Sequence, residues 1–285
     1  MDAKAEEAYR MFLAGERTCD IIRKTGISGG TIDGWKYRGR KPKDTPKPES
    51  NEVKNAGSIV LAVPDLHAPF QHPDALEFLK AVKARFKPTQ IVVLGDEVDF
   101  HSFSRYVPDP DGLSPGHELT KAIEGLIPFY LEFPEALVCE SNHTVRPLKK
   151  MWEAGLPAAF LPTYAKMLNA PDGWKWSQTW QIDGVRYHHG DAGRSGQFAS
   201  AQYIKLFKQS HVHGHLHGHA CCVYEGAYFG INAGCLIDPA AYAFKYARNN
   251  PVPVSLGCAI IMKGRQGHFI PMLTDDAGRW IGSLA

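Results

Sequence analysis

From residue 58 onward, short β-branched apolar runs alternate with amphipathic stretches, and this alternation limits the folds open to the chain. The runs with strand character are 58–63, 89–94 and 136–139, and the helical stretches are 74–86 and 116–131. Strands that alternate with helices along a chain form a largely parallel sheet covered by helices. The sequence therefore predicts an α/β layer fold for this region.

Three later segments, 185–188, 226–231 and 257–262, also have strand composition but few helical stretches between them. We expect them to build a second sheet packed against the first. Hydrophobic residues make up 44% of the 285 residues, which is enough for a large core. The length corresponds to about two domains at roughly 150 residues each.

The front of the chain has a different pattern. Apolar residues recur at helical spacing before residue 14, Thr18 can cap a second short helix, and Ser28 can cap a third that runs through Trp35. Three short helices joined by tight turns are typical of a helix-turn-helix. We therefore predict a helix-turn-helix domain at 1–38, a linker at 39–57 and the main domain at 58–285.

Positive charge is concentrated in this front part. Residues 1–57 hold 12 Lys/Arg and 9 Asp/Glu, although the whole chain has a net charge of only +2. Residues 34–48 hold six basic residues against Asp44 alone. The predicted linker also contains Pro42, Pro46 and Pro48 without apolar periodicity, which is typical of an extended, solvated segment.

No apolar run approaches the ~20 residues that span a bilayer, and the first seven residues are too acidic for a secretory signal. The six cysteines are scattered and include no C-x-x-C pair, which favours reduced thiols. These features predict a protein of the cytoplasm without membrane contact.

Metal-type side chains directly follow several predicted strands. Asp65 and His67 follow the first, Asp96 follows Gly95 after the second, and Ser141, Asn142 and His143 follow the third. Later come His189-Gly190 and Gly214-His215-Leu216-His217. Because ligands of such sheets gather at the carboxyl ends of the strands, we expect these side chains to share one site. Imidazole with carboxylate suits Mn, Fe, Zn or Ni.

These blocks, in this order, resemble the calcineurin-like metallophosphoesterases, whose motifs are D-x-H, G-D-x-x-D, G-N-H-[DE], a later H-G and G-H-x-H. The resemblance covers about residues 58–240 and implies a sandwich of two sheets flanked by helices. It implies a first metal ion held by Asp65, His67, Asp96 and His217. A second ion would be held by Asn142, His189 and His215, with Asp96 bridging both. We expect two divalent ions, Mn first, with Fe, Zn or Ni as alternatives.

The resemblance also implies hydrolysis of a phosphoester by a metal-bridging hydroxide, with His143 as the general acid for the leaving oxygen. Two residues depart from the family motif. Ser141 replaces a glycine, and Thr144 replaces the acidic residue that orients the neighbouring histidine. His143 is then either a weaker acid or finds its carboxylate elsewhere.

Other histidines are surplus to these motifs. We expect His211, His213 and His219 to lie on strand faces or at the surface, and incidental metal binding is the alternative. His188 competes with His189 as a ligand. We favour His189 because only His189 is followed directly by glycine.

The segment from Arg23 to Arg38 resembles the helix-turn-helix of phage terminase small subunits. The resemblance implies DNA contacts from the second helix of the motif and from the basic linker. The predicted DNA-binding residues are Ser28, Gly29, Thr31, Lys36, Arg38, Arg40 and Lys41. A small helical docking module whose charges are solvated is the alternative.

Together these patterns predict a phage- or prophage-encoded metallophosphoesterase that acts on nucleic acid, with the front domain holding it near DNA. The first alternative is a phosphomonoesterase that acts on a phosphoprotein or small phosphate ester and uses the front domain for docking. The second is a metal-independent DNA-binding regulator, which the complete ligand set disfavours.

Overall fold

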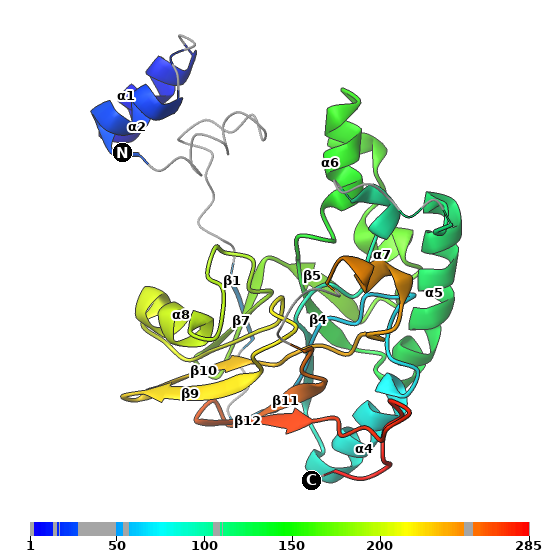
Figure 1. Ribbon diagram of the computed structural model, residues 1–285. Helices are drawn as coiled ribbons and strands as arrows, with labels where there is room; N and C mark the ends of the chain where they lie inside the picture. Colours follow the sequence, from blue (N-terminus) through cyan, green and yellow to red (C-terminus); the bar gives the residue numbers. More distant parts are fainter. Residues whose placement is uncertain are drawn as a thin grey trace. The chain divides into compact units, whose positions relative to one another are not determined.

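The computed structural model describes residues 3–13, 16, 18–27, 50–53, 57–104, 109, 111–247 and 253–284. The chain forms two compact units, residues 1–49 and 50–285 (Figure 1). In the first unit, α1 (Ala3–Leu13) and α2 (Thr18–Thr25) pack through Ala8, Met11 and Ile21. The third predicted helix and all seven predicted DNA-binding residues lie outside the described residues.

The second unit is a sandwich of two six-stranded mixed sheets. One sheet has the order β12-β11-β2-β3-β4-β5, and the other has the order β1-β6-β7-β8-β10-β9. The strands of the first sheet are β2 (Ile59–Val63), β3 (Gln90–Val93), β4 (Ala136–Cys139), β5 (Trp174–Ser177), β11 (Gly257–Met262) and β12 (Gln266–Pro271). Those of the second are β1 (Ser50–Val53), β6 (Thr179–Ile182), β7 (Val185–His188), β8 (His211–His213), β9 (Cys221–Glu225) and β10 (Tyr228–Asn232).

Helices cover the outer faces of both sheets. Those of the second unit are α4 (Ala75–Phe86), α5 (Pro115–Glu132), α6 (Arg146–Glu153), α7 (Tyr164–Met167) and α8 (Ala199–Phe207), with short 3-10 helices η2 (His101–Phe103), η3 (Ala158–Phe160) and η4 (Tyr242–Ala247). None of the described helices is long and apolar enough to cross a membrane.

Strand alternation divides the apolar residues between two cores. In β2, Leu61 and Val63 pack with α4 and α5, whereas Val60 and Ala62 face the second sheet. Facing them across the sandwich are apolar side chains of β6, β7, β8 and β10. Both faces of β2 are therefore buried, which explains its continuous apolar run. The α/β class predicted from the sequence is confirmed, and so is a second sheet packed against the first. One expected member of that second sheet is wrong: residues 257–262 form β11, which pairs antiparallel with β2 in the first sheet.

The division between the units lies earlier than predicted. Residues 50–53, which the sequence analysis placed in the linker, form β1 and pair in parallel with β6. Val53 contacts the core between the sheets. The sequence Ser50-Asn51-Glu52-Val53 has one apolar residue and no periodicity, so its strand conformation comes from pairing with the edge of β6. The predicted boundary at residue 58 therefore cuts off a strand.

We expect a chain that starts at Ser50 to unfold at the temperature of the full chain's second unit. A chain that starts at Ser58 lacks β1 and exposes the edge of β6, so its melting temperature should fall by roughly 2–4 °C for each kcal/mol lost. Calorimetry of the two truncated chains measures the difference. Equal melting temperatures would show that β1 adds no stability.

Candidate metal centre

The candidate ligands gather at one edge of the sandwich. Asp65 and His67 follow β2, Asp96 follows β3, and Asn142 follows β4, all in one sheet. His189 follows β7, and His215 and His217 follow β8, in the other. The strands β2, β3 and β4 are parallel, as are β7 and β8, so each set ends at a common edge. The loops of the two sheets meet there.

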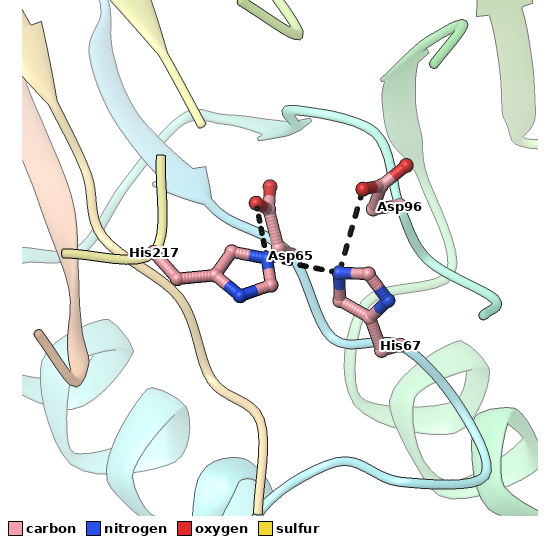
Figure 2. A group of neighbouring side chains, drawn as sticks. All are labelled: Asp65, His67, Asp96 and His217. Carbon is pink, nitrogen blue, oxygen red and sulfur yellow. Dashed lines mark hydrogen bonds and ion pairs between the residues drawn. The ribbon is translucent and has the colours of Figure 1, made fainter. Parts of the chain in front are cut away.

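A first cluster consists of Asp65, His67, Asp96 and His217 (Figure 2). His67 Nε2 lies 3.4 Å from Asp96 Oδ2, and His217 Nε2 lies 3.3 Å from Asp65 Oδ2. The two Nε2 atoms are 3.1 Å apart. One donor atom from each residue lies within 4.8 Å of all the others, which is the spacing of ligands around a single ion.

A second cluster shares Asp96 with the first. His189 Nε2 lies 3.3 Å from Asp96 Oδ2, 2.8 Å from Asn142 Oδ1 and 3.1 Å from His215 Nδ1. The structure thus brings all seven predicted metal ligands together and places Asp96 between the two groups. Their role as ligands stays a prediction.

The backbone of three of these residues is held in an unfavourable conformation. His67, Asp96 and His215 have φ values of 52°, 48° and 67°, a left-handed region that residues with a Cβ rarely adopt. Hydrogen bonds hold two of these turns: His67 N donates to Asp96 O (2.7 Å), and His215 N donates to Asp65 Oδ2 (2.7 Å). Such strain is typical of functional sites, where the surrounding fold keeps it in place.

Gly95 allows the turn that leads to Asp96. Its φ is 98°, and a Cβ there would lie 2.8 Å from Ser141 Cβ and 2.9 Å from His189 Nδ1. Both distances are shorter than real Cβ contacts. The glycine of the G-D-x-x-D motif is therefore required for its conformation and for its small size.

Burial and charge act in opposite directions on the two central carboxylates. Asp65 and Asp96 are 0% and 2% exposed. Burial raises the pKa of both, but neighbouring imidazoles outweigh it and hold both pKa values below the usual range. Burial lowers the pKa of His189, yet the Asp96 carboxylate raises it to about 10. The pocket therefore strongly favours positive charge between its carboxylates.

The donor set fits two divalent transition-metal ions. Asp65 Oδ1 is buried and accepts no hydrogen bond from the described residues, so one carboxylate oxygen is left for a cation. The far nitrogens of two rings are already bound, since His67 Nδ1 contacts Asp99 Oδ1 (2.6 Å) and His189 Nδ1 contacts Leu94 O (3.0 Å). These outer contacts leave Nε2 of each ring for the metal.

His143 lies beside both clusters without joining the predicted ligands. Its Nδ1 is 2.6 Å from Asp99 O and 3.3 Å from Asp99 Oδ1. Burial lowers the pKa of His143, but Asp96 and Asp99 outweigh that effect and raise it above the ordinary value. The carboxylate that the sequence left unassigned for His143 is therefore Asp99. Thr144 instead bonds Ser141 through the two hydroxyls (2.7 Å).

Sequence reasoning missed two residues of this site. Asp99 contacts both His67 and His143, and as the last residue of G-D-x-x-D it could have been found from that motif. Arg146 belongs to none of the motifs. It donates through Nη2 to His143 Nε2 (2.8 Å) and through Nη1 to Asp99 O (2.8 Å). Only its position three residues after His143 could have indicated it.

Two of the three surplus histidines belong to a separate buried stack. His211 and His213 lie on β8, and their rings stack with His188 of β7. His188 Nε2 is 3.2 Å from His211 Nδ1, and this ring also packs on Tyr203 of α8. His188 is therefore engaged away from the metal-type clusters, as its lower ranking against His189 predicted. His219 is partly exposed in the loop after β8.

Comparison with known proteins finds similarities to solved structures only. No protein-family profile matches the chain, and no curated protein matches its sequence. A putative diadenosine tetraphosphatase matches at 16% identity over 79% of this chain and 98% of its own, with a TM-score of 0.41. Vacuolar protein sorting 29 of Cryptosporidium parvum matches at 13% identity over 73% and 86%, with a TM-score of 0.40. The phosphoesterase YfcE of E. coli matches at 18% identity over 71% and 90%, with a TM-score of 0.36.

Replacing Asp96 by Asn should remove both ions, because Asp96 Oδ2 lies within reach of both clusters and supplies charge to each. We expect metal affinity to fall by at least ~100-fold, the upper end of the range for outer contacts alone. Elemental analysis after dialysis against Mn measures the loss. Asp172→Asn, an exposed change of the same chemistry, is the control. Retention of two ions by Asp96→Asn would contradict the bridging position.

The histidine stack predicts instability in acid. Burial lowers the pKa of His211 to about 4, so folding keeps it neutral while the unfolded chain binds a proton below about pH 6.5. Stability is therefore lost as pH falls from about 6.5 to 4, by about 3 kcal/mol for this one group. His211→Gln should reduce this loss of unfolding free energy between pH 6.5 and 4, as measured by urea unfolding with a chelator present. His117→Gln, on an exposed helix start, should leave the slope unchanged. Parallel slopes for wild type and His211→Gln would disprove the assignment.

Proposed function

We propose that the protein is a dinuclear metal-dependent phosphoesterase that hydrolyses phosphoester bonds in nucleic acid. The observation that supports this most is Asp96, whose buried carboxylate lies between two groups of imidazole and carboxylate donors. Two ions bound there would clamp a phosphate and activate water as the nucleophile. Mn as the ion, the cytoplasm as the location and a phage origin stay predictions from the sequence.

The residues around His143 suit proton donation to the leaving oxygen. Asp99 holds Nδ1, so Nε2 is the end of the ring that faces outward. Asp96 and Asp99 raise the pKa of His143, which favours proton uptake at Nε2 once Arg146 turns from this nitrogen to a bound phosphate. Arg146 Nη2 lies 2.8 Å from Nε2, so a phosphate oxygen in this position would receive hydrogen bonds from both residues. Asp99 positions His143, and Arg146 adds charge for the anion.

Nucleic acid as the substrate is supported by the front of the chain. Helices α1 and α2 are the first two of the three short helices expected at the front of the chain, and six basic residues against one acidic residue at 34–48 suit phosphate contacts. A DNA-binding unit joined to the catalytic unit raises the local concentration of the polymer. High sequence specificity is not needed for this effect.

The test is one panel of substrates assayed with Mn. It contains single-stranded and duplex DNA, 5′- and 3′-phosphorylated ends, and p-nitrophenyl mono- and diesters. We expect hydrolysis of DNA and of the diester. Hydrolysis of monoesters alone would favour the phosphomonoesterase alternative, with a docking role for residues 1–49. No hydrolysis of any substrate by a protein that holds two ions would refute the proposed chemistry.

His143→Ala in the same panel tests proton donation. Both ions should stay bound, because His143 is not among the predicted ligands, while turnover of DNA falls by roughly 10²–10⁴. The loss should be smaller for nitrophenyl esters, whose leaving group needs no proton. Equal losses on DNA and nitrophenyl diester, or a missing ion, would count against a general acid. The exposed change His117→Ala is the control.

A further inference from the structure

The segment from α6 to η3 carries three large apolar side chains that are exposed to solvent. Trp152 is 40% exposed, Leu156 is 44% exposed and Phe160 is 69% exposed. Figure 1 shows α6 extending away from the sheets. The short helix η3, which holds Phe160, lies beside α6. Aromatic rings of this size left in water indicate a surface that binds something.

A row of side chains connects this surface to the candidate metal centre. Arg146, Lys149 and Trp152 are spaced three residues apart on α6 and are therefore successive neighbours on its surface. Arg146 contacts His143 at the inner end, and Trp152 lies about 9 Å further along the helix axis. A polymer bound at the metal centre would reach Trp152 within a few nucleotides.

The charge beside the aromatic rings selects the kind of partner. Lys149 is exposed and makes no side-chain hydrogen bond or ion pair within the described part of the chain. On the same helix, Lys150 pairs with Glu153, the only acidic residue of α6. Exposed aromatic rings beside an unpaired cation suit single-stranded nucleic acid, whose bases stack and whose phosphates are anionic. A self-association surface would instead be depleted of lysine.

We propose that Lys149, Trp152 and Phe160 form a binding track for single-stranded nucleic acid at the exit of the catalytic site. Lys149 pairs with a backbone phosphate, and Trp152 and Phe160 stack on unpaired bases. Duplex DNA keeps its bases stacked on one another and gains little from such rings. This inference rests on the proposed function and adds the strandedness of the substrate.

The experiment measures binding and turnover of a 12-residue oligo(dT) by the full chain. Binding is followed by fluorescence anisotropy with a chelator present, which prevents cleavage, and turnover is measured with Mn. Trp152→Ala and Phe160→Ala should each weaken binding by about 5- to 100-fold, the range for removal of a stacking ring. Trp152→Phe should restore most of it. Hydrolysis of the p-nitrophenyl diester should be unchanged, because none of these residues touches the reacting atoms.

Lys149→Ala should lower the slope of log affinity against log salt by about 0.7, the value for one phosphate of a single strand. The matched controls are Leu131→Ala on α5, where the side chain is 79% exposed, and Lys175→Ala on β5. Neither control should change oligo(dT) binding. Binding of duplex DNA should be nearly the same in all variants.

Three outcomes would overturn the track. Unchanged oligo(dT) affinity in Trp152→Ala and Phe160→Ala is the first. An equal loss for duplex and single strand is the second. The third is a wild-type dimer in sedimentation that Trp152→Ala makes monomeric without an effect on oligo(dT), which would assign the surface to self-association. Absence of diester hydrolysis in the wild type is a failure of the proposed chemistry, and the anisotropy data remain a separate test of the track.

Discussion

Two carboxylates buried side by side at the end of a sheet impose the main constraint on this structure. Asp65 and Asp96 are almost completely removed from water, and the nearest compensating groups are imidazole rings from both sheets. Charge in such a pocket is costly unless cations or hydrogen-bond donors surround it. The loops after β2, β3, β7 and β8 therefore have to converge on one point, and this requirement fixes how the two sheets are joined at that edge.

The backbone strain at the site follows from the same requirement. His67, Asp96 and His215 contribute side chains to the two clusters and have left-handed φ values. Each such residue costs of order 1–3 kcal/mol, which the packed core between the sheets must offset. The apolar strands that lead into these turns, with Val60, Ala62 and Leu94 buried, hold the chain so firmly that the turns cannot relax. The conformation of the site therefore depends on the packing of the core.

Most of the site could be predicted from the sequence because each residue follows an apolar run that is itself recognisable. A strand end, a glycine and a metal-type side chain together define a position in space as well as in the chain, as Gly95 and Asp96 show. Asp99 and Arg146 were missed because their contacts depend on how the loop after β3 folds against the start of α6. No periodicity in the sequence indicates the contact between this loop and α6.

Elements that depend on their neighbours for stability were also the ones that pattern reasoning misplaced. Residues 50–53 contain a single apolar residue, and only the free edge of β6 makes them a strand. His211 and His213 do lie on a strand, as expected, but their burial under α8 in a neutral stack with His188 was not foreseen. In both cases the partner lies far away in the chain, so its effect is invisible in a local window.

The turns that carry the predicted ligands and the segment from α6 to α7 differ in exposure, and this difference bears on substrate choice. The predicted ligands lie on short turns, and their side chains are buried or half-buried and held by hydrogen bonds, so this part has little freedom to adapt to different substrates. The segment from α6 to α7 follows β4 and the predicted ligand Asn142. It is largely exposed and carries no predicted ligand itself. Under the proposed function, the turns would carry the reaction, whereas α6 and η3 would contact the rest of the substrate. Because fold alone does not determine substrate, the residues that distinguish one phosphoester from another are to be sought on this exposed segment.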